Sequence, residues 1–229
     1  MNSVDLSKGI SPSSVGTKAA NLGRLIGLGF AVPRGFVITR CSLVLFLEEN
    51  GLEHMVTAFL NGGDSVTDEQ YRDLCAQVQQ APLPDSLQGQ LRESTQRLLE
   101  QSSVGLAVRS SSLVEDSKEA SFAGIFDSVL GVNSLQAVEE ALRRCWCAGW
   151  SPSAMRYARQ HDLKLAPDHM AVIVQELVEA QSAGVLFTAE ALTGNPWVFS
   201  LEACHGLAAE LVAGDAAADT GRWRGTPAR

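Results

Sequence analysis

The segment from Val104 to Val132 constrains the fold of this chain more than any other, because it joins two strand-like runs through a loop of unusual composition. Its sequence reads VGLAVRSSSLVEDSKEASFAGIFDSVLGV. The runs 104–108 and 125–132 have the length and apolar composition of strands. We therefore expect two strands joined by a loop, with Arg109 closing the first strand and the serines 110–112 inside the loop.

This loop offers groups that bind phosphate. Hydroxyls and backbone N–H groups donate to phosphate oxygens, and an Arg adds a fork of donors with a fixed charge. The residues expected to contribute are Arg109, Ser111 and, in the small-residue turn before the second run, Gly124. A serine-rich surface loop with a salt-bridged Arg is the alternative, and composition alone favours it.

The run AVRSSSLVEDSKEASFAGIFDSVLGV closely resembles a motif of a known family. The motif, A-V-R-S-S-A-x-x-E-D-x-x-x-x-S-F-A-G, belongs to the nucleotide-binding domain of phosphoenolpyruvate synthase, pyruvate phosphate dikinase and rifampicin phosphotransferase. The resemblance implies an α+β, ATP-grasp-like fold of mixed antiparallel sheets flanked by helices. It implies that residues 1–178 form the N-terminal subdomain of the grasp. Residues 179–229 would then be the hinge and a truncated start of the second subdomain.

A second match follows the polar residues 1–15, which we expect to form an entry loop. Gly16, Thr17 and Lys18 open a run with helical spacing, and a helix N-terminus with a Lys in its first turn suits an anion. The spacing is not that of a Walker A loop, and a solvent-exposed Lys on an amphipathic helix is the plainer alternative. The segment GTKAANLGRLIGLGFAVPRGFVIT, however, resembles the family pattern G-G-K-x-x-x-L-G followed by G-x-x-V-P-x-G-F, with Thr17 replacing the second Gly. The resemblance implies that Lys18 reaches the nucleotide phosphates and, with Arg109, serves catalysis.

Two strand-like runs, 169–178 and 182–188, are joined by the short link 179–181. Without the resemblance, an antiparallel hairpin is the preferred interpretation. The resemblance implies instead that the first run ends in the family's hinge, Q-x-M-V, where adenine bonds to the backbone. The residues expected at the adenine are Gln175, Glu176, Leu177 and Val178, and those expected at the ribose hydroxyls are Glu179 or Gln181.

A late motif begins at Glu202 and is similar to the family's E-x-x-x-G-L-G-E, with Ala208 in place of the second Gly. The resemblance implies that Glu202 is a carboxylate of the nucleotide site. His205 is not the family's phosphohistidine, which belongs to a separate domain with a different motif. ATP implies Mg²⁺, but in the family most of its carboxylate ligands follow in the second half of the grasp, so we assign no metal ligands.

Composition excludes some classes of binding partner and indicates a cellular compartment. The net charge of −8 disfavours nonspecific binding to nucleic acid. The N-terminus is polar and no apolar run reaches ~18 residues, so we expect neither a signal peptide nor a membrane span. The five cysteines are odd in number and irregularly spaced, which favours a reduced cytoplasmic setting. We interpret Cys145 and Cys147 as buried thiols, because they lack the second pair of a zinc site.

The resemblance implies that this chain is the ATP-binding portion of a dikinase-type phosphotransferase, in which ATP phosphorylates a histidine on a partner domain or chain. That partner would also carry the pyruvate or phosphoenolpyruvate site, or would act on an antibiotic hydroxyl. We expect the chain alone, as a fragment, a split-gene subunit or a degenerate relative, to be inactive in phosphotransfer. The alternative is a non-catalytic nucleotide-binding or interaction module.

Overall fold

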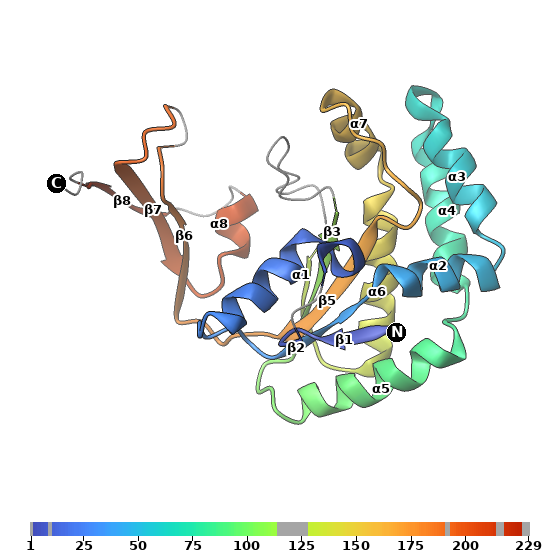
Figure 1. Ribbon diagram of the computed structural model, residues 1–229, viewed down its shortest axis with the longest axis horizontal. Helices are drawn as coiled ribbons and strands as arrows, with labels where there is room; N and C mark the ends of the chain where they lie inside the picture. Colours follow the sequence, from blue (N-terminus) through green and yellow to red (C-terminus); the bar gives the residue numbers. More distant parts are fainter. Residues whose placement is uncertain (1, 9–10, 114–127, 191–192, 214–217, 226–229) are drawn as a thin grey trace. The chain divides into compact units, whose positions relative to one another are not determined.

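A computed structural model describes residues 2–8, 11–113, 128–190, 193–213 and 218–225 (Figure 1). The chain divides into two compact units, Met1–Leu177 and Val178–Arg229. The boundary predicted after residue 178 falls one residue beyond this division. No helix among the described residues is long and apolar enough to cross a membrane.

The first unit is built on a five-stranded antiparallel sheet in the order β1-β2-β5-β3-β4. Its strands are β1 (Ser3–Asp5), β2 (Gly35–Ile38), β3 (Leu106–Ser112), β4 (Ser128–Val132) and β5 (Met170–Glu176). The middle strand, β5, pairs with β2 and β3, and all its residues except the last are buried. A strand buried on both faces requires an apolar layer on each side of the sheet.

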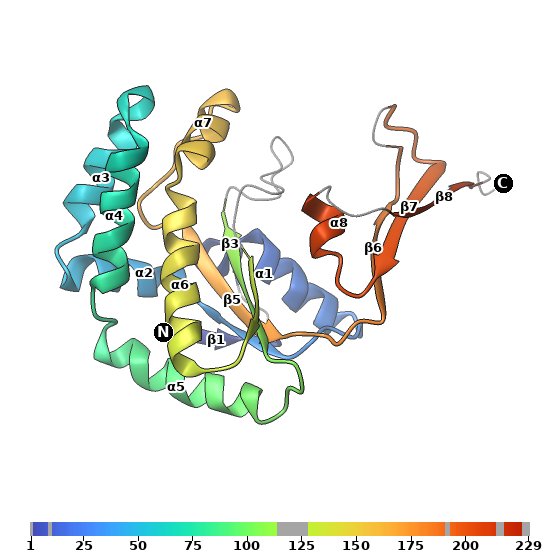
Figure 2. The ribbon, with the colours of Figure 1, turned by 180° about the vertical axis from the view of Figure 1, so that it is seen from behind.

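Helices supply these two layers. On one face, α1 (Pro12–Gly27) packs Val15 and Ala19 against Val37, Ala171 and Ile173 of the sheet. Figure 1 shows α1 in front of the strands, and Figure 2 shows α6 in front of them from behind. The larger core, on the other face, draws on α2 (Arg40–Glu49), α3 (Glu53–Asn61), α4 (Asp68–Gln80), α5 (Asp85–Leu99), α6 (Leu135–Gly149) and α7 (Pro152–Gln160). A short 3₁₀ helix, Gly63–Ser65, follows α3.

Helix α4 begins at a local sequence signal, in which Thr67 is followed three residues later by Gln70. The Oγ1 of Thr67 accepts from the N–H of Gln70 at 3.2 Å, and the Gln70 side chain accepts from the N–H of Thr67 at 2.9 Å. This reciprocal pair is a capping box at the start of α4. Helix α6 has an apolar face with the spacing of a helix, on which Val138, Leu142 and Trp146 are fully buried.

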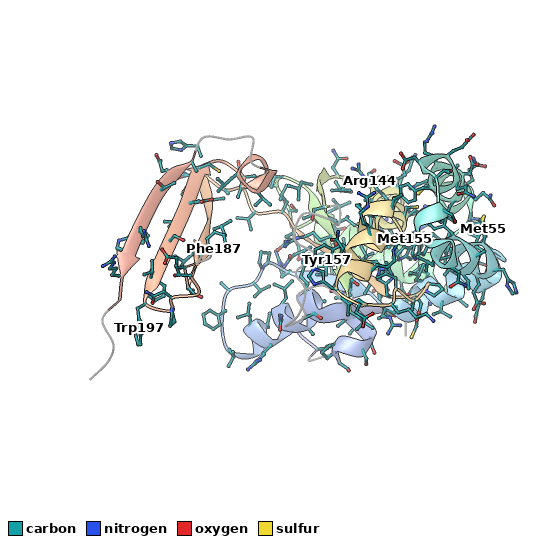
Figure 3. All side chains as sticks on the ribbon, turned by 90° about the horizontal axis from the view of Figure 1, so that it is seen from above. Met55, Arg144, Met155, Tyr157, Phe187 and Trp197 are labelled. Atoms are coloured by element: carbon teal, nitrogen blue, oxygen red, sulfur yellow. The ribbon has the colours of Figure 1, made fainter. Side chains whose placement is uncertain are left out.

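The second unit contains a three-stranded antiparallel sheet and one short helix. Its elements are β6 (Ser182–Phe187), β7 (Val198–His205), α8 (Ala209–Ala213) and β8 (Asp219–Arg224), with strand order β6-β7-β8. Large apolar side chains stay exposed here, among them Phe187 and Trp197, which Figure 3 labels. On one face of the sheet, Leu186 lies opposite Leu201, and Phe199 lies opposite Trp223.

The expectation that the serines 110–112 lie in a loop is wrong. They continue β3, opposite Val172, Ala171 and Met170 of β5, and all three are fully buried. The strand therefore extends past Arg109, because pairing with β5 satisfies the serine backbone and the small side chains fit a covered sheet. Residues 114–127, which include Gly124, lie outside the described residues, so the loop expected there stays a prediction.

Two further interpretations change. Residues 1–15 are not only an entry loop, because Ser3–Asp5 pair with β2 as an edge strand. A polar strand is accommodated there because an edge strand has a neighbour on one side only. The hairpin alternative for 169–178 and 182–188 is excluded, since β5 and β6 belong to different sheets.

Candidate functional site

Helix α1 is broken near its start, at Gly16. This residue has φ +78° and ψ 165°, in a region that glycine enters readily and other residues rarely adopt. A Cβ atom at Gly16 would lie 2.1 Å from the carbonyl oxygen of Ser111, so β3 leaves no room for a side chain. The regular helix therefore starts after Gly16, with Thr17 and Lys18 in its first turn.

Lys18 is directed at the sheet. Its Nζ donates to the carbonyl oxygen of Ser110 at 3.2 Å, and the residue is half-buried. The plainer alternative, a solvent-exposed Lys on an amphipathic helix, is therefore wrong.

Arg109 lies on the same face of the sheet as α1. It is directly opposite Ile173 on β5, and side chains of directly opposed residues share a face. Ile173 belongs to the small core beneath α1. Arg109 is half-buried, and within the described part of the chain its guanidinium has no ion-pair partner. The structure thus brings the cations of Lys18 and Arg109 to one face of one sheet, and their binding of phosphate stays a prediction.

Ser111 also lies on this face, but its hydroxyl has partners inside the protein. The Oγ accepts from the N–H of Ala19 at 3.0 Å and donates to the carbonyl oxygen of Val15 at 2.7 Å. The side chain is fully buried. Its contact with phosphate stays a prediction, and its observed role is to join β3 to α1.

The residues expected at the adenine lie at the end of β5, where two side chains hold the scaffold. Gln175 is buried, and its Nε2 donates to the carbonyl oxygen of Pro33 at 2.8 Å. Glu176 accepts three hydrogen bonds from Arg34: Nη2 donates to Oε1 at 2.6 Å, and Nε and the backbone N–H donate to Oε2 at 3.1 and 3.3 Å. The N–H of Leu177 donates to the carbonyl oxygen of Gly105 at 3.1 Å. The predicted contact with adenine through the backbone is not tested by this geometry.

The remaining predicted residues belong to the second unit. Val178, Glu179 and Gln181 are exposed, and the carbonyl oxygen of Gln181 accepts from the N–H of Gly206 at 2.9 Å. Glu202 is an exposed residue of β7, opposite Val185 on β6 and Thr220 on β8. Their roles at the ribose and the phosphates stay predictions.

The described residues do not fit a resident metal ion. They contain no cluster of three or more His, Cys, Asp or Glu side chains placed to hold one. Mg²⁺ prefers oxygen ligands in octahedral geometry, usually one or two carboxylates together with phosphates and water. Glu202 is a single carboxylate, so we derive no chemical step through a metal.

Two scaffold residues were not singled out from the sequence. Arg40 donates from Nη1 to the carbonyl oxygen of Ser13 at 2.8 Å and from Nη2 to Asp168 at 2.6 Å. His169 is buried, and desolvation lowers its pKa to about 4. Its Nδ1 lies 2.8 Å from the carbonyl oxygen of Ala166. Arg40 has no local sequence signal, because its contacts join segments that only the fold brings together.

Comparison with known proteins shows the family of this chain. Residues 12–226 match the model of a family described as pyruvate phosphate dikinase, AMP/ATP-binding domain. The chain belongs to this family. The predicted fold class, an α+β fold with antiparallel sheets flanked by helices, agrees with the family and is confirmed.

Individual relatives support the assignment. A probable phosphoenolpyruvate synthase of Methanothermobacter thermautotrophicus is 32% identical over 212 residues, which cover 90% of this chain and 31% of the relative. A phosphoenolpyruvate synthase of Aeropyrum pernix is 32% identical over 225 residues, covering 94% of this chain and 27% of the relative. A rifampicin phosphotransferase of a Streptomyces species is 32% identical over 207 residues, covering 88% and 24%. The chain thus spans less than a third of the length of these relatives.

Proposed function

We propose that this chain binds ATP as the nucleotide-binding portion of a dikinase-type phosphotransferase. The observation that carries the proposal is the position of Lys18 and Arg109 on one face of the five-stranded sheet, beside the helix that begins after Gly16. Two cations and a helix N-terminus at one place favour a polyanion. In a chain of net charge −8, such a local concentration of positive charge is informative.

In this proposal each part of ATP has its own contacts. The phosphates lie against Lys18, Arg109 and Gly124, and the adenine bonds to the backbone at 175–178. Glu179 or Gln181 holds the ribose hydroxyls, and Glu202 faces the nucleotide as a carboxylate. Fixed cations at the phosphates favour transfer because they neutralise charge on the transferring group. ATP would arrive with Mg²⁺, whose ligands we leave unassigned.

The phosphoryl acceptor in this proposal is a histidine on a partner domain or chain. The relatives named phosphoenolpyruvate synthase and rifampicin phosphotransferase suggest pyruvate or an antibiotic hydroxyl as the final acceptor. We also place the reaction in the reducing cytoplasm, as the cysteine pattern predicts.

Binding is tested by calorimetry with ATP and adenosine on the wild type, Lys18→Ala and Arg109→Ala. Each substitution removes a charge-assisted contact worth roughly 1.5–3 kcal/mol, so ATP affinity should fall about 10- to 150-fold. Adenosine affinity should stay within about twofold, because adenosine carries no phosphate. Arg92→Ala on the exposed side of α5 is the matched control. Equal losses for ATP and adenosine would indicate a folding role and contradict the proposal.

Phosphotransfer is tested separately, with β- and γ-labelled ATP and a polypeptide that carries the histidine domain of a relative. Acid-labile label on that polypeptide, dependent on this chain, supports the enzyme proposal. ATP binding without any transfer would favour the non-catalytic module. Robust turnover by this chain alone would contradict the division of labour proposed here.

A further inference from the structure

The break at Gly16 leaves a new helix N-terminus that has to be capped. The first N–H groups of a helix have no partner within the helix, and the residue at the N-cap position usually supplies a side-chain acceptor to the N2 or N3 N–H. Gly16 occupies the N-cap position of the regular helix and has no side chain. Lys18 and Ala19 then occupy N2 and N3. The cap has to come from elsewhere in the fold.

Ser111 supplies this cap from a strand that is 92 residues away from Ala19 in the sequence. Its Oγ accepts from the N–H of Ala19 at 3.0 Å, which is the N3 contact that an N-cap side chain normally makes. The same hydroxyl donates to the carbonyl oxygen of Val15 at 2.7 Å, on the other side of the break. One buried hydroxyl therefore fixes the chain before and after Gly16.

The neighbouring serine provides a contrast within the same strand. Ser110 and Ser111 point to opposite faces of the sheet, because successive strand residues alternate. Both are fully buried. Among the described residues, however, the Oγ of Ser110 has no hydrogen-bond partner. The side chain of Ser110 therefore contributes nothing to the cap, although its carbonyl oxygen accepts from Lys18.

Arg40 fixes the residues of α1 that precede Gly16. Its Nη1 donates to the carbonyl oxygen of Ser13 at 2.8 Å, and its Nε donates to the carbonyl oxygen of Asp168 at 2.7 Å. The turn before Gly16 is thus tied to the end of the segment that leads into β5. Together, Ser111 and Arg40 leave the first turn of the regular helix little freedom to move.

We propose that Ser111 is a positioning residue for Lys18. It caps the helix that begins after Gly16 and so holds the Lys18 ammonium at β3, on the face that carries Arg109. In this role Ser111 acts through the helix, and the role requires no contact between Ser111 and the nucleotide. The inference rests on the proposed function, since it requires that Lys18 contact the phosphates of ATP.

The test compares Ser111→Ala with Ser110→Ala in calorimetric titrations with ATP and with adenosine. Loss of an N-cap contact corresponds to roughly a 5- to 30-fold change in an equilibrium, and ATP affinity of Ser111→Ala should fall by about this factor. Adenosine affinity should stay within about twofold. Ser110→Ala, which removes a hydroxyl without a described partner, should match the wild type with both ligands. Wild-type ATP affinity in Ser111→Ala would overturn the inference.

A double-mutant cycle with Lys18→Ala separates positioning from direct contact or general damage. If Ser111 acts through Lys18, then Ser111→Ala should change ATP affinity less than about twofold in the Lys18→Ala background. Fully additive losses would overturn the inference. Should Ser111→Ala fail to fold, Ser111→Cys keeps a weak donor and acceptor and should show the same pattern with smaller losses.

The outcomes also separate this inference from the proposed function. A wild type that does not bind ATP, or a Lys18→Ala variant that binds it normally, overturns both. A wild type that binds ATP, with a weakened Lys18→Ala variant and a normal Ser111→Ala variant, overturns the positioning role alone.

Discussion

The two sheets of this chain differ in how they are covered. The five-stranded sheet of the first unit has an apolar layer on each face, and its central strand β5 is buried almost throughout. On the three-stranded sheet of the second unit, Leu186 is 57% exposed and Trp223 is 52% exposed. Regions with few buried contacts open locally at low free energy, whereas covered strands open only with the whole unit.

This difference bears on the proposed site. Lys18 and Arg109 stand on elements that the covered sheet holds in place, with bonds such as those of Ser111 to α1. Glu179 and Glu202 are exposed residues of the second unit. We expect the first group to be preorganised for phosphate and the second to be adjusted by whatever it binds.

The largest expected effect comes from removing a core tryptophan of the first unit. Trp146 is fully buried on α6, with its ring centroid 4.8 Å from that of Phe46. Trp146→Ala should lower the free energy of unfolding by about 3–5 kcal/mol, because it leaves a large cavity. Urea unfolding followed by far-UV circular dichroism measures the change.

The matched control is the half-exposed tryptophan of the second unit. Trp223→Ala should cost less than about 1 kcal/mol in the same urea experiment, since its ring is already partly in water. Similar decreases in the free energy of unfolding for the two variants would contradict the difference in burial between the two units.

A smaller effect is expected from pH, through the buried His169. Burial lowers its pKa to about 4, whereas the unfolded chain keeps a value near 6.5. As the pH falls from about 6.5 towards 4, the unfolded state binds a proton that the folded state does not. The free energy of unfolding should therefore decrease across this window, by up to about 3 kcal/mol for this group.

Urea midpoints measured between pH 7 and 4.5 test this dependence on His169→Gln and on His54→Gln, which alters an exposed histidine. His169→Gln should flatten the pH dependence, and His54→Gln should leave it as in the wild type. A wild-type slope in His169→Gln would assign the dependence to other groups.

The smallest effect concerns a cap at the surface of the first unit. Thr67→Ala removes the capping box of α4 and should cost about 1 kcal/mol. Thr57→Ala, inside α3, is the control and should change stability by less than about 0.5 kcal/mol. Thermal unfolding of both variants measures the change in stability. A loss of stability for Thr57→Ala as large as that for Thr67→Ala would contradict the role of the capping box.

Features that depend on neighbouring residues were predictable from the sequence. The capping box at Thr67 and the apolar face of α6 follow from spacings of three or four residues. The positions of Lys18 and Arg109 were suggested by motifs that resemble a family, and the fold brings both to one face of the sheet.

Features that depend on distant partners were not predictable. Ser3–Asp5 forms a strand because it pairs with the free edge of β2. The residues next to Ser3–Asp5 in the sequence carry no signal for this pairing. The strand β8, Asp219–Arg224, was missed because its residues are mostly polar and its partner is β7. The composition of the serines in β3 predicts a loop, but their pairing with β5 makes them part of a strand. In each case the deciding contact spans many residues of sequence.

Amide hydrogen exchange measured with and without ATP shows where the nucleotide contacts the chain. If Lys18 and Arg109 bind the phosphates, ATP should slow exchange at the first turn of the regular helix, 17–19, and along 109–112, and leave exchange in α4 unchanged. A cavity of about 640 Å³, lined by parts of β1, β2 and α5, offers the contrasting outcome. Protection confined to 30–36 and 90–101 around that cavity, or none at 17–19 under saturating ATP, would contradict a phosphate site at Lys18 and Arg109.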